Sequence, residues 1–150
     1  MINPQSIILK TGNQVINLNN SDNIKSIYLG SGESDINSII DFIYSTSEIK
    51  TNVDIKIVLT DKAKLSLNCK LIIPKNIKFI EGFLRIKVLI LSQDARVSIT
   101  PCLEIHENDV KCGHALAIGV PDRNHIEYLI SRGLDLKQAI QLIVDGFLNN

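Results

Sequence analysis

The chain has 150 residues, of which 45% are hydrophobic, and its formal net charge is +0 at pH 7. This length predicts one folded domain with a real core. Zero net charge and the lack of a basic stripe argue against nucleic-acid binding. The longest apolar runs, such as Val88–Leu91, are far too short to cross a membrane. Three cysteines cannot pair fully and the start of the chain does not resemble a signal peptide, so we expect reduced thiols in the cytoplasm or an organelle stroma.

Short β-rich runs separated by turn residues predict strands over most of the chain up to about residue 118. The segment Asp35–Tyr44 leaves two interpretations open. Its isoleucines fit a helical stripe behind a possible Asp35 cap, but Ile-rich sequence also favours a strand. The predicted strands are Ile7–Leu9, Val15–Leu18, Ile27–Leu29, Ile55–Leu59, Lys64–Leu67, Lys70–Ile73, Ile77–Ile80, Arg85–Leu91, Arg96–Ile99, Leu103–His106 and Ala115–Ile118.

An internal repeat indicates the architecture. Residues 57–73 align without gaps on residues 89–105, at an offset of 32. Each copy contains a strand, a polar turn, a small alanine, an alternating strand, a polar kink and a further strand. A fixed period of this kind predicts stacked β coils that bury their apolar faces on one another. A β-sandwich remains the alternative, because it is also built from short strands and regular turns.

The C-terminal segment predicts two helices. The first begins at Pro121-Asp122 and ends at Gly133, and the second begins at Asp135 with Gln138 completing a capping box. A solenoid needs its open end covered, and we expect these helices to cover it. The second helix is apolar on more than one face, which implies a further surface for a partner.

Soft and ionisable side chains gather in residues 102–114. Residues two apart share a face of a strand, so Cys102, Glu104 and His106 lie on one side, and Cys112 lies on the same side as His114. Thiolate, imidazole and carboxylate form the ligand set of zinc and iron sites. The simpler alternatives stay open: Cys112 as a small buried residue, Cys102 as core, and Glu104 as a surface carboxylate or a partner that orients His114.

Several further segments occur in a specific order and spacing. They are Leu89–Val97, Thr100–Ile105, Glu107–Ala115, Gly119, Tyr128–Gly133, Ala139 and Gly146-Phe147. Through them, from about Asp54 to Phe147, the chain resembles the SufB/SufD family of iron–sulfur cluster assembly proteins, and its SufD members more than its SufB members.

The resemblance implies a mainly β, right-handed parallel β-helix with a C-terminal two-helix segment, within a scaffold complex that also holds the ATPase SufC. It implies that Cys112 and His114 match a cysteine and histidine at the SufB–SufD interface, where an iron–sulfur cluster is held transiently. It also implies that the C-terminal helices dock SufC. The residues expected to bind this partner are Tyr128, Arg132, Gly133, Ile140, Ile143, Val144 and Phe147.

The chain also departs from the family. Family members are much longer, and residues 1–50 show no clear match. Gly113 stands where a serine is usual, and Ala95 stands where SufB carries a cysteine, which argues against a SufB-type role. We expect a β-helix core over residues 1–119 and a helical segment over residues 120–150.

Three functions are compatible with these features. The leading one is a non-enzymatic scaffold subunit with metal ligands Cys112, His114, Cys102 and Glu104. Its partners would be a SufC-like ATPase and a SufB-like subunit or a second copy. The second is a structural solenoid without a cluster role. The third is an enzyme with Cys112 as nucleophile, disfavoured because no oxyanion element is visible. No P-loop is present, so we expect no directly bound nucleotide.

Overall fold

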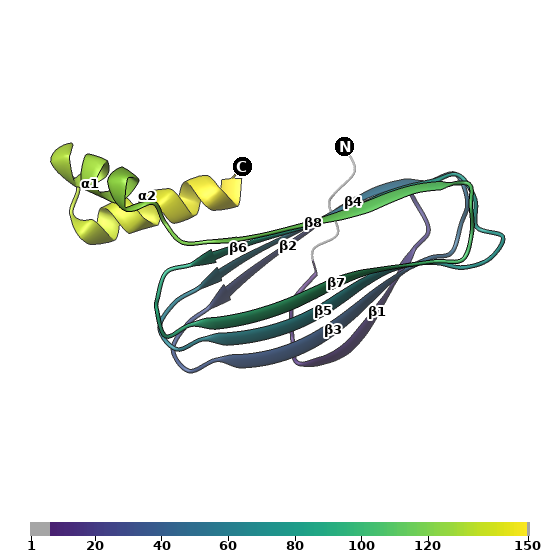
Figure 1. The fold of residues 1–150 in the computed structure, drawn as a ribbon, viewed down its shortest axis with the longest axis horizontal. Coiled ribbons are helices and arrows are strands. Elements are labelled where there is room, and N and C mark those ends of the chain that lie inside the picture. Colours follow the sequence, from purple (N-terminus) through teal and green to yellow (C-terminus); the bar gives the residue numbers. More distant parts are fainter. Residues whose placement is uncertain (1–6, 150) are drawn as a thin grey trace.

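The computed structural model describes residues 7–149, and in this range eight parallel strands form two four-stranded sheets (Figure 1). Consecutive strands alternate between the sheets, so each turn of the chain adds one strand to each, and four turns stack into a β-solenoid. The predicted parallel solenoid is confirmed. One sheet, here the odd sheet, contains β1 (Gly12–Leu18), β3 (Asp35–Tyr44), β5 (Lys64–Ile73) and β7 (Arg96–Ile105). The even sheet contains β2 (Asn23–Gly30), β4 (Lys50–Leu59), β6 (Ile80–Ile90) and β8 (Val110–Gly119).

The core lies between the two sheets, because alternate residues of every strand point inward. The segment for which the sequence left helix and strand open is strand β3, and its inner residues Ile40, Phe42 and Tyr44 are fully buried. Burying one large apolar side chain stabilises the folded state by roughly 1.5–3 kcal/mol relative to leaving it exposed. A slip of one residue would turn a whole row of them toward solvent, so the burial pattern fixes the register.

The repeat predicts the pairing of β5 with β7 correctly. Lys64 lies beside Arg96 and Ile73 beside Ile105, at the offset of 32. Strands β4 and β6 are offset by one residue less, since Leu59 lies beside Ile90, and the following turn absorbs the extra residue. The predicted polar kinks are absent, because β5 and β7 run through without a break. Pro101 is tolerated in β7 because that strand is at the edge of its sheet.

Two strand predictions at the start of elements are wrong. Residues 7–10 form no strand, and β6 begins at Ile80 rather than at Ile77. Residues 7–10 precede β1, and residues 74–79 form the turn in which the chain passes from the odd sheet to the even sheet.

The two C-terminal helices are α1 (Arg123–Ser131) and α2 (Leu136–Asn149), and their boundaries agree with the predicted caps. The Asp122 carboxylate accepts a hydrogen bond from the Asn124 amide at 2.9 Å. Gly133 has φ 97°, the left-handed conformation that ends a helix. Asp135 and Gln138 form the reciprocal capping box, with distances of 2.8 and 3.0 Å.

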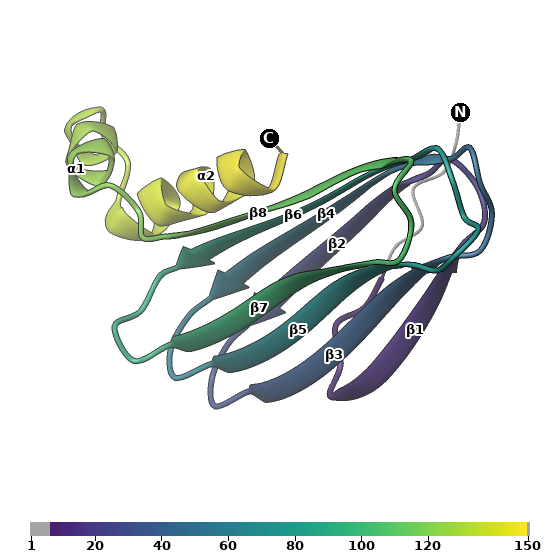
Figure 2. The ribbon, with the colours of Figure 1, turned by 45° about the vertical axis from the view of Figure 1, so that its right-hand side comes forward.

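The expectation that these helices cover the open end of the solenoid is wrong. Figures 1 and 2 show them along the outer side of the even sheet. The Lys56 Nζ, on the outer face of β4, donates to the Leu148 carbonyl oxygen at 2.9 Å. The helices bury Ala139 and have few contacts with the sheet. The inner face of the last turn therefore stays exposed, as at Ile118, which is 48% exposed.

Candidate functional site

The open end of the solenoid consists of the inner faces and free edges of β7 and β8. In the turn below, Leu71 is 1% exposed and Leu84 is 0% exposed. Their counterparts in the last turn, Leu103 and His114, have no further turn above them, and Ile105, which lies beside the buried Ile73, is 40% exposed. Edge strands also present unpaired backbone N–H and C=O groups. The open end thus exposes apolar side chains of the core together with the free backbone N–H and C=O groups of two edge strands.

Cys112 and His114 lie on the inner face of β8 at this open end. In register, Cys112 lies beside Gly82 and His114 lies beside Leu84 of β6. The column that ends in His114 contains Ile24, Val53 and Leu84 before it, so an imidazole takes the place of an aliphatic side chain only in the last turn. The two side chains are separated by about 6.6 Å of strand. Both can therefore reach one group held above the open end by a second surface.

Cys112 lies above a tight packing arrangement. A Cβ at Gly82 would lie 3.1 Å from the Cys112 Sγ and would also meet the Tyr44 hydroxyl, so only glycine fits there. Tyr44 is hydrogen-bonded to Thr51, and burial raises the pKa of Tyr44 to about 12. Burial also raises the pKa of the Cys112 thiol, which a hydrogen bond with the Gly82 backbone offsets in part. Binding a metal would require loss of the thiol proton.

The packing around position 113 explains why glycine occupies it. The ring of Phe83 lies over it, and a Cβ at position 113 would approach the ring to 3.1 Å. Arg85 stacks on the same ring, with its Cζ 5.3 Å from the centroid. Glycine in place of the expected serine therefore leaves room for the aromatic ring of Phe83 on β6.

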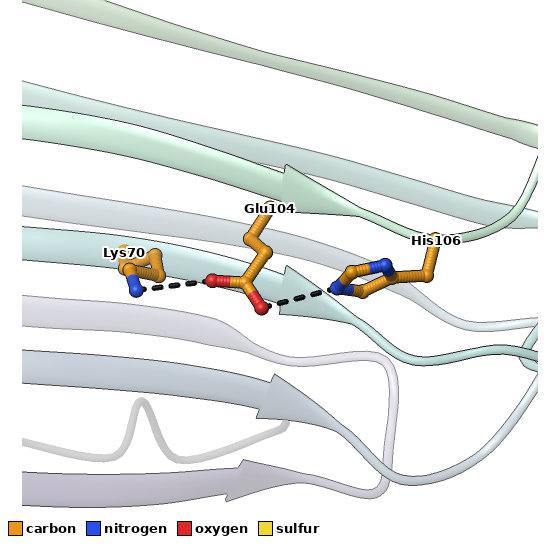
Figure 3. A network of polar contacts seen from close by, with 3 residues as sticks. All are labelled: Lys70, Glu104 and His106. Atoms are coloured by element: carbon orange, nitrogen blue, oxygen red, sulfur yellow. Dashed lines mark hydrogen bonds and ion pairs between the residues drawn. The ribbon is translucent and has the colours of Figure 1, made fainter.

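The other two predicted ligands, Cys102 and Glu104, lie on the other sheet, on its outer face. Cys102, Glu104 and His106 are on the outer face of β7, and Figure 3 shows Glu104 between His106 and Lys70. The Glu104 carboxylate is 3.1 Å from the His106 Nε2 and 3.0 Å from the Lys70 Nζ. The hydrogen bond with His106 and then Lys70 lower the pKa of Glu104. Glu104 is therefore not positioned to orient His114.

The structure thus divides the residues that the sequence groups together. Cys112 and His114 face inward, and Cys102 and Glu104 face outward. No group of three or more His, Cys, Asp or Glu side chains in residues 7–149 is arranged to hold a metal ion. Cys69 is in the core, where burial raises its pKa to about 12, so its role is packing.

The surface of the helix pair is only partly the one expected. Tyr128 is exposed and carries Arg132 on its ring, with 5.2 Å from the guanidinium Cζ to the centroid. The most exposed apolar side chains of α2 are Leu136, at 59%, and Leu142, at 51%. Sequence reasoning did not single these two out, because it counted apolar residues without separating the faces of the helix. The expected residues on α2 that are instead half-buried are Ile140, Ile143, Val144 and Phe147.

The fold defines a class: a parallel β-solenoid that ends in an uncovered turn and carries a C-terminal helix pair. The family model described as "SUF system FeS cluster assembly, SufBD core domain" matches residues 8–147. The chain therefore belongs to the SufBD core-domain family. The match begins at residue 8, so it includes residues 8–50, which carry none of the segments on which the resemblance rested. Within residues 7–149, no helix is both long and apolar enough to cross a bilayer.

Curated relatives agree with this family. The iron–sulfur cluster assembly protein SufD of Bacillus subtilis is 44% identical over 62 residues, which cover 41% of this chain and 14% of the relative. The SufD of Escherichia coli is 32% identical over 92 residues, covering 61% and 22%. The chloroplastic protein ABCI7 of Arabidopsis thaliana is 37% identical over 59 residues, covering 39% and 12%. The chain thus matches about a fifth or less of each relative's length.

Proposed function

We propose that the chain acts as a non-enzymatic subunit of an iron–sulfur cluster assembly scaffold. The observation that carries the proposal is the open end of the solenoid, where an uncovered apolar core surrounds Cys112 and His114. An exposed apolar surface rimmed by polar groups is typical of a protein interface. Such a scaffold works in the cytoplasm or an organelle stroma.

The partner at the open end would be a SufB-like subunit or a second copy of the chain. One chain supplies two inward ligands, Cys112 and His114, whereas a cluster usually takes four. The partner would then contribute the rest, and the cluster would be cargo held transiently at the shared interface. Cys102 and Glu104 lie on the outer face of β7, so in this proposal they do not bind the same cluster.

Cluster content of the assembled complex tests this assignment. After anaerobic reconstitution, the Cys112→Ser, His114→Ala double variant should retain little iron and sulfide. The matched control is Cys102→Ser, which removes an exposed thiol from the outer face of the other sheet and should leave cluster content nearly unchanged. Cys69→Ser should do the same, apart from a loss of stability. Equal content in the wild type and the double variant would instead leave a structural solenoid without a cluster role.

The helix pair would dock a SufC-like ATPase, and in this proposal the nucleotide would bind to that ATPase. Its exposed apolar side chains Leu136, Leu142 and Tyr128 form a surface that the sheet leaves free. Leu142→Asp should abolish co-purification with the cognate ATPase, and so should Phe147→Asp. Val15→Asp, an exposed apolar position on β1, is the control and should leave the complex intact. Survival of the complex in Leu142→Asp, with an unchanged circular dichroism spectrum, would refute the docking assignment.

The nucleophile alternative is disfavoured by the surroundings of Cys112. Catalytic cysteines depend on a lowered pKa, because the thiolate is the reactive form. Burial raises the pKa of Cys112 instead. Its neighbour His114 points the same way from the same strand. Within residues 7–149 no group of three His, Cys, Asp or Glu side chains gathers there, so no carboxylate is placed to orient the imidazole.

A further inference from the structure

A small cavity of about 120 Å³ lies between the C-terminal end of α2 and the outer face of the even sheet. Its strands are β2, β4 and β6, and its charged side chains lie on the outer face of the even sheet, opposite the inner face that carries Cys112 and His114. Its lining residues are Lys25, Ser26, Ile27, Asp54, Ile55, Lys56, Arg85, Lys87, Leu148 and Asn149.

The cavity gathers four cationic side chains around one carboxylate. Asp54 is already engaged, because its Oδ1 is 2.7 Å from the Arg85 Nη1. Lys56 lies beside Lys87 in register, and burial, Lys87 and Lys25 together lower the pKa of Lys56. Like charges brought together in this way repel one another, and the repulsion is strongest where solvent is partly excluded.

The end of α2 accounts for only one of these cations. A helix C-terminus carries a partial negative charge and is stabilised by a nearby lysine. Lys56 fills that role through its hydrogen bond to the Leu148 carbonyl. Lys25 and Lys87 form no ion pair with any other residue between 7 and 149. Their positions at the cavity are therefore not explained by the helix.

We propose that this cavity binds the phosphate group of a small phosphate monoester. Lysines act as point charges toward a phosphate, and Lys25 and Lys87 face the cavity from β2 and β6, the strands on either side of β4. A bound dianion would relieve the repulsion among the cations. Ile27 and Leu148 provide an apolar wall for a short organic part, which inorganic phosphate lacks.

Titration calorimetry of the 150-residue chain at low salt tests the site, with glycerol phosphate and inorganic phosphate as probes. We expect saturable binding that weakens with added salt and is tighter for the monoester. The Lys25→Met, Lys87→Met double variant should lose affinity by about tenfold or more, equivalent to about 1.4 kcal/mol. This variant leaves the contact between Lys56 and Leu148 in place, so α2 should stay docked.

The control is the Lys64→Met, Lys75→Met variant, which removes the same charge from β5 and from the loop after it. It should bind like the wild type. Absence of binding, or equal weakening in both double variants, would overturn the proposal. A chain extended by a few glycines after Asn150 provides a second check. If only the extended chain bound the probes, the cavity's occupant would be the chain's own carboxyl end, and the proposal would be wrong.

Discussion

The middle turns and the last turn of the solenoid place the same residue types at equivalent positions but bury them to different extents. Leu71 of β5 and Leu103 of β7 are equivalent positions of the repeat and lie side by side. Leu71 is sealed in the core, whereas Leu103 is half-buried. The difference is the presence or absence of the next turn. A repeat that builds a core therefore leaves an exposed apolar face wherever it stops.

The last turn differs from the middle turns in a second respect. Along one inner column, Val53 and Leu84 are followed by His114, and along the next column Gly82 is followed by Cys112. A polar group is costly inside a core but acceptable at its end. The ionisable residues thus mark the turn that meets solvent or a partner.

The largest effect that separates the two regions should be on stability. Leu71→Ala should lower the free energy of unfolding by roughly 2–5 kcal/mol, because it leaves a cavity among buried neighbours. Leu103→Ala should cost about 1 kcal/mol, because the site is already half open. Urea unfolding of the two variants measures the difference. Equal losses would mean that the open end is covered in solution.

The packing beneath Cys112 provides the next test. Gly82→Ala places a methyl group against the Tyr44 hydroxyl and the Cys112 Sγ, and we expect a loss of about 1–3 kcal/mol. The matched control is Gly119→Ala, at the end of β8, where a Cβ meets nothing within 4 Å. That variant should change the free energy of unfolding by less than about 0.5 kcal/mol. A harmless Gly82→Ala would show that the Tyr44 ring moves freely.

The three cysteines should differ in their rates of reaction with iodoacetamide. Cys102 is exposed on the outer face and should react first. Cys112 is half-buried with a raised pKa, so less thiolate is present and the reaction should be several-fold slower. Cys69 should react only when the protein unfolds, since burial raises its pKa to about 12. Mass spectrometry of the labelled peptides gives the order, and fast labelling of Cys69 would contradict the sealed core.

Much of the fold could be predicted from the sequence, because period-two alternation and the repeat are local signals. The β5–β7 register followed from the offset of 32. The location of α1 and α2 did not follow. Their caps are set by residues within the helices, but where they dock depends on contacts such as Lys56 with Leu148, 92 residues apart.

The candidate site was likewise predictable only where it depends on local sequence signals. Alternation correctly grouped Cys112 with His114, since both lie on one strand. It could not tell that β7 and β8 belong to different sheets, which sends Cys102 and Glu104 to the outer surface of the odd sheet. The contact of Glu104 with Lys70 depends on strand pairing, and position 70 lies 34 residues before it. The repeat offset could have indicated it, because Lys70 and Cys102 are equivalent positions.

The smallest expected effect is on the outer face of the last turn, at Glu104. His106 and Lys70 lower the pKa of its carboxyl below the ordinary 4.5, so the ionised form is favoured by folding. The stability from this group is therefore present above pH 4.5 and is lost as the pH falls through the folded-state value. Wild type should be more stable than Glu104→Gln at about pH 6, and the difference should shrink toward about pH 3. The group is exposed, so solvent screening keeps this effect small. In the Lys70→Met, His106→Asn background the pH-dependent difference should vanish, and its persistence there would assign it to other charges.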